Sequence, residues 1–336
     1  MSKLFSELRI NEKIILPNRI VFPPMATEKA NDDGSITDEI VSYYGEMAKL
    51  GMGLLIVEHC AVLPEGRTNL KQITIARDSD TEGHKRIAEA VHLANKIVAV
   101  QINHAGSNRS NAFTPPPVGP SPVPHPNTGV IPQELTISQI SEIIKAFGDA
   151  AKRAKEAGYD MIEIHSAHGF LGSQFLSTLT NKRNDKYGGQ IENRMRFLLE
   201  VIEEVKGRVD KDYPILVRLG ISDNPPGVKI FENGLTLEEG LKVAKALEES
   251  GISMLDISGG MCGSRPKEVQ HIQGYFVPFA EAAKEVTNLP IIITGGIKRA
   301  EFAEKILKAQ SADLVGIGRT LISDKNWIKR AKSHLE

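Results

Sequence analysis

The chain has 336 residues, of which 41% are hydrophobic and 25% are charged, and its 41 Lys and Arg nearly balance its 42 Asp and Glu to give a net charge of −1. This composition is typical of a globular protein and excludes disordered and fibrous classes, and the near-zero charge predicts no general attraction to nucleic acid or to an anionic membrane. Cys60 and Cys262 cannot form a disulfide framework, and no apolar run reaches the ~18 residues of a membrane span, so we expect a cytoplasmic protein.

Short apolar runs alternate with segments of helical periodicity along most of the chain. The runs are uniformly apolar, which is typical of strands covered on both faces, and predict strands at residues 19–24, 53–57, 97–102, 160–164, 214–219, 254–257, 290–294 and 312–317. The periodic segments predict helices at residues 37–50, 81–95, 137–157, 192–206, 237–250, 277–286, 300–308 and 325–334. The helix at 137–157 has a capping-box pair, Thr136 and Gln139, before it and Gly158 after it.

Eight strands that are each followed by a helix match the repeat of a closed (β/α)8 barrel. We therefore predict the α/β class, with residues 1–336 forming a single TIM-barrel domain with long βα loops; a doubly wound open sheet is the alternative fold. The connections from strand to helix are long and the reverse connections are short, for example residues 103–136 against residues 158–159. In a barrel the long connections share the face at the carboxyl ends of the strands, where active sites are built.

Two of these long connections have a distinctive composition. Residues 181–189 are polar and rich in turn formers, and we interpret them as an active-site loop. Residues 103–136 are stiffened by prolines, and a mobile lid and a structural cover are both open interpretations; the prolines are Pro115, Pro116, Pro117, Pro120, Pro122, Pro124, Pro126 and Pro132.

The last two predicted strands end in glycines. Gly295 and Gly296 follow one strand, and Gly318 with Arg319 follows the other. Bare backbone amides and an arginine at these barrel positions favour a phosphate site, although the glycines could simply form tight turns. The chain lacks both the dinucleotide-binding and the P-loop glycine patterns.

Polar side chains at other strand ends are expected to face the same barrel mouth. They are Gln101, His165, His168 and Arg218, with His59 and His104 as weaker candidates. A buried arginine requires either a bound anion or a structural carboxylate partner, and the sequence alone leaves both open.

The pair His165 and His168 is compatible with several kinds of site. The His-Glu-x-x-His pattern of a zinc helix and the Gly-x-Ser-x-Gly pattern of a serine hydrolase are both absent, so we predict no metal and no serine nucleophile. Two imidazoles that donate hydrogen bonds to one substrate oxygen are the chemical interpretation, and two ordinary buried histidines are the alternative.

Several motifs in order resemble the Old Yellow Enzyme family of FMN-dependent ene-reductases, from about residue 3 to residue 330. The sequence is most similar to the bacterial branch that includes the thermophilic-type enzymes and the barrel domain of 2-enoate and 2,4-dienoyl-CoA reductases. The motifs are LPNRIV at 16–21 with PM at 24–25, VQINHAG at 100–106, EIHSAHGFL at 163–171, FLS at 175–177, TNKR at 180–183, DKYGG at 185–189, ENR at 192–194 and GR at 318–319.

The resemblance implies an FMN-dependent oxidoreductase that takes hydride from NADH or NADPH and reduces an activated C=C bond. His165 and His168 would hold the substrate oxygen, and Arg218 would lie near the flavin pyrimidine, where a cation stabilises negative charge. The implied cofactor-binding residues are Pro24, Met25, Ala26, His59, Gln101, Arg218, Gly295, Gly296, Gly318 and Arg319. The implied substrate-binding residues are Glu28, His165, His168, Phe170 and Tyr275.

The chain departs from the family pattern at several positions. Phe170 stands where the family usually has a tyrosine proton donor, which leaves the donor unassigned. Ala26 and Glu28 stand where the thermophilic-type enzymes have a cysteine and a tyrosine, and Glu28 could contact substrate or point into solvent. The sequence up to Glu336 contains no cysteine cluster and no added dinucleotide-binding domain, so electrons are expected from a diffusible nicotinamide or another subunit.

Two alternative functions remain open at this stage. A flavin-binding subunit of a larger reductase, with little activity alone, is the first, and Phe170 favours it. A tRNA-dihydrouridine synthase is the second, and the balanced charge argues against it. The expected partners are a small alkene and a nicotinamide, with a homo-oligomer or an electron-donating subunit as further possibilities and no nucleic acid or membrane.

Overall fold

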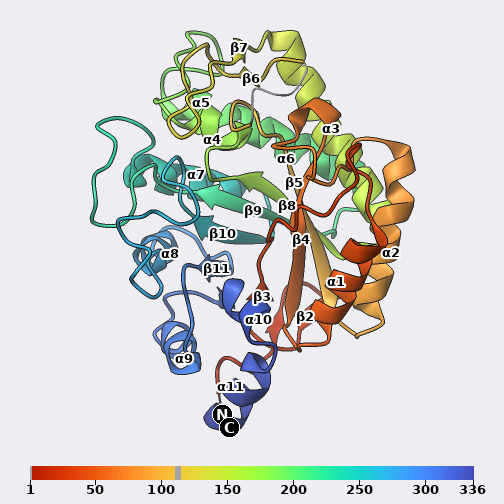
Figure 1. Ribbon diagram of the computed structural model, residues 1–336. Helices are drawn as coiled ribbons and strands as arrows, with labels where there is room; N and C mark the ends of the chain where they lie inside the picture. The colour runs from red at the N-terminus through yellow and green to blue at the C-terminus, as the bar shows by residue number, and fades with distance from the viewer. Residues whose placement is uncertain (1, 110–114) are drawn as a thin grey trace.

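The computed structural model describes residues 2–109 and 115–336, and Figure 1 shows its strands enclosed by an outer layer of helices. The strands form a closed parallel barrel, because the last one pairs back onto the first. This confirms the predicted (β/α)8 class over the open-sheet alternative. In order around the barrel the strands are β3 (Ile20–Phe22), β4 (Leu54–Ala61), β5 (Ile97–Asn103), β8 (Met161–Ser166), β9 (Ile215–Gly220), β10 (Met254–Ser258), β11 (Ile291–Thr294) and β12 (Leu314–Gly316).

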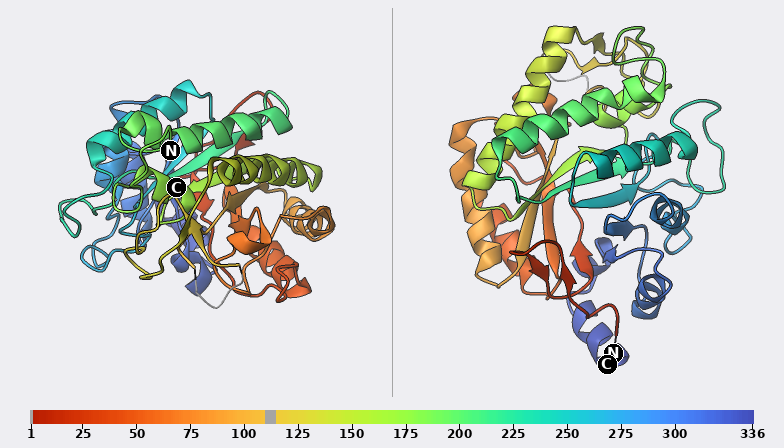
Figure 2. Two further views of the ribbon diagram at one scale, coloured as in Figure 1. Left: turned by 90° about the horizontal axis from the view of Figure 1, so that it is seen from above. Right: turned by 180° about the vertical axis from the view of Figure 1, so that it is seen from behind.

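The helices pack their apolar faces on the outside of this barrel, and Figure 2 shows the arrangement from above and from behind. Among the described residues they are α1 (Asp38–Ala48), α2 (Thr81–His92), α3 (Ile137–Glu156), α4 (Leu171–Leu176), α5 (Ile191–Arg194), α6 (Arg196–Arg208), α7 (Leu237–Glu249), α8 (Val277–Lys284), α9 (Ala300–Lys308), α10 (Arg319–Ser323) and α11 (Trp327–Leu335). The predicted capping box before α3 is present, with Thr136 accepting from the Gln139 amide. In the part of the chain that the structure describes, no helix is long and apolar enough to cross a membrane.

Several short elements were not predicted. The helix expected at 192–206 is divided into α5 and α6 at Met195. The helix α4 forms because Leu171 and Phe175, one helical turn apart, are both fully buried. The remaining short elements are too brief to show a periodic pattern: the pair β1 (Leu8–Arg9) and β2 (Ile15–Leu16), the pair β6 (Val118–Gly119) and β7 (Gln133–Glu134), and the turns η1 (Pro64–Gly66) and η2 (Asp78–Asp80).

The barrel interior changes from apolar to polar along the strands. A cluster that includes Met161, Leu216 and Met254 fills the end nearest the strand starts, and Leu16 from β2 packs onto it from below. Successive side chains on a strand point to opposite faces, so the residue two positions later points inward again. On β8, β9 and β10 these residues are Glu163, Arg218 and Asp256. The strands therefore place charged groups directly above an apolar floor.

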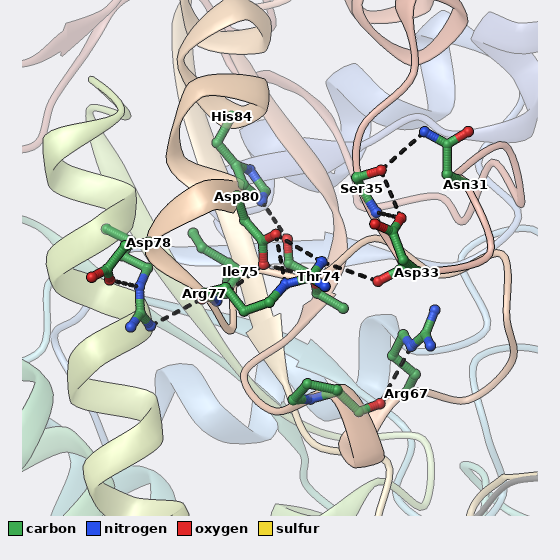
Figure 3. A network of polar contacts seen from close by, with 12 residues as sticks. Asn31, Asp33, Ser35, Arg67, Thr74, Ile75, Arg77, Asp78, Asp80 and His84 are labelled. Atoms are coloured by element: carbon green, nitrogen blue, oxygen red, sulfur yellow. Dashed lines mark hydrogen bonds and ion pairs between the residues drawn. The ribbon is translucent and has the colours of Figure 1, made fainter.

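A polar network at the start of α2, drawn in Figure 3, fixes the connection after β4. The Asp80 carboxylate accepts from the Thr74 hydroxyl at 2.7 Å and from the Arg77 guanidinium at 2.9 Å. The His84 ring joins the same network, with Nε2 2.9 Å from the Thr74 carbonyl oxygen and Nδ1 2.9 Å from the Tyr159 hydroxyl. These groups satisfy one another, so the network holds the backbone and leaves no group of His84 free.

Candidate functional site

A cavity of about 1440 Å³ opens where the strands of the barrel end. Seven strands each contribute at least one residue to its wall, either from the end of the strand or from the turn that follows it: β3, β4, β8, β9, β10, β11 and β12. This volume exceeds the ~300–1,000 Å³ of an ordinary ligand site, so a cofactor and a substrate can be held together. The position agrees with the face on which the long connections were predicted to build an active site.

The connection after β3 forms one wall, with Pro23, Pro24, Met25 and Ala26 lining the cavity. It is tied to β4 through Thr27, whose backbone N–H and hydroxyl both donate to Glu58, at 2.9 and 2.6 Å. The prolines prevent a helical turn at this point, and the two hydrogen bonds fix where the wall stands.

His165 and His168 meet in this cavity, with ring centroids 4.9 Å apart and planes at 82°. His165 is on β8, which continues two residues beyond the predicted strand end. His168 follows with a φ of 57°, a left-handed conformation that costs free energy in a non-glycine residue. Two contacts hold it there: its N–H donates to the Gly259 carbonyl at 3.0 Å, and the Asn108 side chain donates to its carbonyl at 2.9 Å.

Both imidazoles are neutral near pH 7. Burial lowers the pKa of His165 and of His168 well below the usual histidine range, and the positive charge of Arg218 adds to this. A neutral imidazole has one N–H donor and one acceptor nitrogen. His168 Nε2 lies 2.7 Å from the Ser258 hydroxyl, so Ser258 orients that ring. Among the described residues, the buried Nδ1 of His165 has no hydrogen-bond partner.

Phe170 and His59 stand beside this pair. The Phe170 ring is 4.7 Å from the His165 ring and 5.3 Å from the His59 ring, measured between centroids, and has no group that can donate a proton. The Gln72 side-chain nitrogen lies 2.7 Å from His59 Nδ1, and burial lowers the pKa of His59 to about 4. His59 is therefore neutral as well, although part of its ring faces the cavity.

Arg218 reaches the cavity from β9 and pairs with a carboxylate that the sequence did not single out. Its Nε lies 3.2 Å from Asp256 Oδ2, and the Asp256 side chain is fully buried. Of the two partners that the sequence left open for a buried arginine, a bound anion or a structural carboxylate, the carboxylate is present as Asp256. Gln101, expected to contact the cofactor, is not part of the described cavity wall; its amide donates to Glu163 Oε1 at 2.7 Å, one layer below.

The glycine-ended turns form the opposite end of the cavity. Gly296, with a φ of 64°, and Gly318 line it together with Arg319 and Tyr275. A Cβ on Gly318 would lie 3.0 Å from Met25 Sδ, so the wall after β3 and the turn after β12 approach each other closely. Arg319 is exposed, as are Lys298 and Arg299, which line the same end. This end of the cavity is therefore cationic.

Most of the predicted site residues meet at this cavity, and three do not line its described wall. Gln101 lies beneath it. Gly295 is next to it, where a Cβ would be 3.3 Å from the Tyr275 ring, and Glu28 is exposed with a φ of 56°. The residues that meet there are Pro24, Met25, Ala26, His59, His165, His168, Phe170, Arg218, Tyr275, Gly296, Gly318 and Arg319. The weaker candidate His104 is buried and accepts a hydrogen bond from the Gly106 amide at 3.0 Å.

The prediction of an active-site loop at 181–189 is wrong, because none of these residues lines the cavity. Their polar groups hold the proline-rich segment instead. Arg183 Nη1 donates to the carbonyls of Pro120 and Leu135, at 2.9 and 2.7 Å, and the Lys182 amide donates to the Ser121 hydroxyl at 2.9 Å. The described part of the proline-rich segment is thus pinned as a cover; residues 110–114 lie outside the described residues.

Sequence reasoning also missed residues that complete the site. Asp256 and Ser258 are on β10, in a strand that reads as largely apolar. Both point inward with Met254, two and four residues earlier, and this alternation is the signal that could have found them. Asn108, which supports His168, is in the proline-rich segment and has no comparable signal. Across residues 2–109 and 115–336, no group of three His, Cys, Asp or Glu could hold a metal ion.

Comparison with known proteins places these features in context. The sequence pattern of the "NADH:flavin oxidoreductase / NADH oxidase family" matches residues 3–336. An NADH oxidase of Thermoanaerobacter brockii is 45% identical over 335 residues, covering 98% of this chain and 50% of that protein. The chain thus spans half the length of this relative. An NADPH dehydrogenase of Clostridium acetobutylicum is 37% identical over 326 residues, covering 97% of this chain and 93% of that protein.

A solved structure gives the same result for the fold. An Old Yellow Enzyme homologue from Zymomonas mobilis superposes with a TM-score of 0.83 at 26% identity, covering 99% of this chain and 93% of that one. The predicted resemblance and the barrel fold are both confirmed by these matches.

Proposed function

Because the chain belongs to the NADH:flavin oxidoreductase / NADH oxidase family, whose cofactors are a flavin and a nicotinamide, we propose that it is an FMN-dependent oxidoreductase. In the proposed reaction, NADH or NADPH is used to reduce an activated C=C bond, such as that of an enone or enoate. Residues 1–336 would act as one FMN-binding unit. The observation that carries the proposal is the pair of neutral imidazoles, His165 and His168, in a cavity that also holds a buried arginine.

The residues present fit FMN. At the glycine-ended turns, Gly296 and Gly318 line the cavity and bring bare backbone to its wall, which is the kind of surface on which backbone amides bind a phosphate. Arg319 would supply the positive charge for that phosphate. Thr294 Oγ1 is buried without a hydrogen-bond partner in the described residues, which leaves one polar group for the cofactor. A bound FMN would supply the hydride-transfer chemistry between the nicotinamide and the β-carbon of the acceptor.

His165 and His168 would bind the carbonyl oxygen of the acceptor. Each neutral ring can donate one N–H, and Ser258 and the backbone contacts of His168 fix the His168 ring in advance. Donors that are held in place before negative charge develops on an oxygen stabilise the transition state without a cost of reorientation. Arg218 would favour negative charge at the pyrimidine edge of the flavin, since its guanidinium is buried beside the same cavity.

Protonation of the acceptor α-carbon would come from solvent. Phe170 has no donor group, and the Tyr275 hydroxyl already donates to the Ser264 carbonyl at 2.8 Å. Glu28 is not part of the described cavity wall. The proton therefore arrives from water in the open part of the cavity.

Isotope labelling tests this function. The FMN-loaded protein is incubated without oxygen with nicotinamide deuterated at its hydride-donating position and with 2-cyclohexenone. We expect deuterium at the β-carbon of the saturated ketone and a solvent proton at the α-carbon. Nicotinamide oxidation that requires oxygen and leaves every enone, enoate and nitroalkene unreduced would exclude the C=C reductase.

A flavin-binding subunit with little activity alone is the second candidate. One observation favours it: Phe170, beside His165, stands in place of a proton donor. Copurification with an electron-donating subunit, together with inert flavin in the isolated chain, would support this candidate. Direct reduction of its flavin by NADH or NADPH would count against it.

A further inference from the structure

A layer of charge is sealed inside the barrel beneath the cavity. Four neighbouring strands contribute Gln101, Glu163, Arg218 and Asp256, whose exposed fractions are 1%, 0%, 5% and 0%. The apolar cluster with Met161, Leu216 and Met254 closes the layer from below. Only the Arg218 side faces the cavity.

This layer has two carboxylates and only one guanidinium. Glu163 Oε1 accepts a hydrogen bond from Gln101, but Glu163 Oε2 has no hydrogen-bond partner among the described residues. Neither carboxylate oxygen of Asp256 makes a hydrogen bond of good geometry there, although Arg218 Nε is 3.2 Å from one of them. Two buried negative charges against one positive charge are costly, so the pair must hold a proton. Burial, and then the charge of Asp256, raise the pKa of Glu163, while burial raises the pKa of Asp256 against the effect of Arg218.

The other ionisable groups around the layer cannot take this role. On the cavity side, burial lowers the pKa of His59, His165 and His168, so these rings stay neutral through the physiological range. Glu58 on β4 accepts from Thr27 and from the Tyr44 hydroxyl, on the side of α1. The neighbours from β5 and β11, Gln101 and Thr294, do not ionise.

We propose that Glu163 and Asp256 form a redox-linked proton store, in which Glu163 stays protonated and Asp256 takes up a proton from solvent when a flavin beside Arg218 gains negative charge. This rests on the proposed function, because it requires the cofactor to contact Arg218. Negative charge on the cavity side competes with Asp256 for the single guanidinium, and protonation of Asp256 then relieves the excess charge. Hydride from the nicotinamide carries both electrons; the Asp256 proton comes from water and returns to water on reoxidation, so the overall stoichiometry is unchanged.

The first test measures the flavin midpoint potential of the FMN-loaded protein between pH 5 and pH 9. The pH dependence gives the number of protons taken up on reduction. We expect Asp256→Asn to take up about one proton fewer than the wild type at neutral pH. Glu163→Gln, which mimics the protonated side chain, is expected to keep the wild-type number and is the matched control. Equal proton numbers in the wild type and Asp256→Asn would overturn the proposal.

The second test needs no variant and therefore does not depend on whether Asp256→Asn folds. An infrared difference spectrum between the oxidised and reduced wild-type protein should show a new protonated-carboxyl band that shifts in D2O. Absence of that band would overturn the proposal. Dithionite can reduce the flavin in both tests, so failure of every alkene as an acceptor would remove the proposed function without changing either result.

Discussion

Two histidines in this molecule are similarly buried but differ in whether their ring nitrogens have hydrogen-bond partners. His84, in the network of Figure 3, is 0% exposed, and both of its ring nitrogens have partners at 2.9 Å. His165, at the cavity, is 4% exposed, and its Nδ1 has none among the described residues. Burial lowers the pKa of both rings. The unsatisfied hydrogen bond, and not the burial or the pKa, distinguishes the candidate site from the structural one.

Two buried aspartates repeat this contrast. Asp80 accepts from the Thr74 hydroxyl, from the Arg77 backbone and from the Arg77 guanidinium. Asp256 has an arginine 3.2 Å away but no hydrogen bond of good geometry. Hydrogen-bonded groups such as those of Asp80 stabilise the fold, whereas His165, Asp256 and Thr294 have unsatisfied buried atoms at or beneath the cavity; other unsatisfied atoms in the described residues, such as Ser166 Oγ and Ser173 Oγ, lie away from it. Substitutions in the two regions should therefore separate stability from reactivity.

The largest expected effect is on the alkene step. His165→Ala or His168→Ala removes one hydrogen-bond donor to the acceptor oxygen, which should slow anaerobic reoxidation of the reduced flavin by 2-cyclohexenone by ~10²–10³-fold. Reduction by the nicotinamide should change much less, because hydride donation to the flavin develops no charge on that oxygen. Stopped-flow absorbance of the flavin measures both steps.

His84→Ala is the matched control at the saturated site. It should lower the free energy of unfolding by about 2–4 kcal/mol, because it leaves a buried cavity and removes two hydrogen bonds. The rate constants of the folded protein should stay unchanged. Denaturant unfolding combined with the same stopped-flow assay checks this, and a slowed alkene step in the His84 variant would show that His84 also affects the reaction.

The decrease in the free energy of unfolding caused by His84→Ala should also depend on pH. Burial lowers the pKa of His84 to about 4, below the ~6.5 of an unfolded histidine, so at intermediate pH the unfolded chain binds the proton more tightly. The stabilising contribution of His84 is then complete above about pH 6.5 and declines as the pH falls toward 4. The difference in unfolding free energy between wild type and variant should shrink over that range. A pH-independent difference would show that the neutral ring is not what stabilises the network.

Phe170→Tyr adds a proton donor to the cavity, whereas the histidine variants remove hydrogen-bond donors. If solvent supplies the α-carbon proton in the wild type, the variant should reoxidise faster with enones, by up to about 10²-fold, as a positioned acid replaces water. The solvent isotope effect on the alkene step should change with it. An unchanged rate and isotope effect would show that protonation does not limit this step.

The smallest effect is expected at Glu28. Its carboxylate is exposed and does not line the described cavity wall, so Glu28→Gln should leave both half-reactions within about twofold of the wild type, as is usual for a solvated surface charge. A tenfold change in the Michaelis constant for an acceptor would restore Glu28 as a substrate-contacting residue.

Sequence reasoning recovered the barrel because its signals are local: apolar strands, helical periodicity, and glycines such as Gly158 at helix ends. The residues His165, His168 and Gly318 line the cavity because they lie at, or directly follow, the ends of strands that converge on one face. It missed Asp256, since its role depends on which residues oppose each other across neighbouring strands. Gln101 lies beneath the described cavity wall, where it donates to Glu163, and its contact with the cofactor stays a prediction. Arg183 was misread for a similar reason, because its partners, Pro120 and Leu135, lie far away in the sequence.

The most direct test of the central claim is anaerobic reoxidation of the reduced, FMN-loaded wild-type protein by a panel of enones, enoates and nitroalkenes, followed by flavin absorbance. We predict that at least one class restores the oxidised spectrum, that the saturated product forms, and that His165→Ala suppresses the reaction while His84→Ala does not. A flavin that is reoxidised only by oxygen, with no alkene reduced by any of the three proteins, would contradict it.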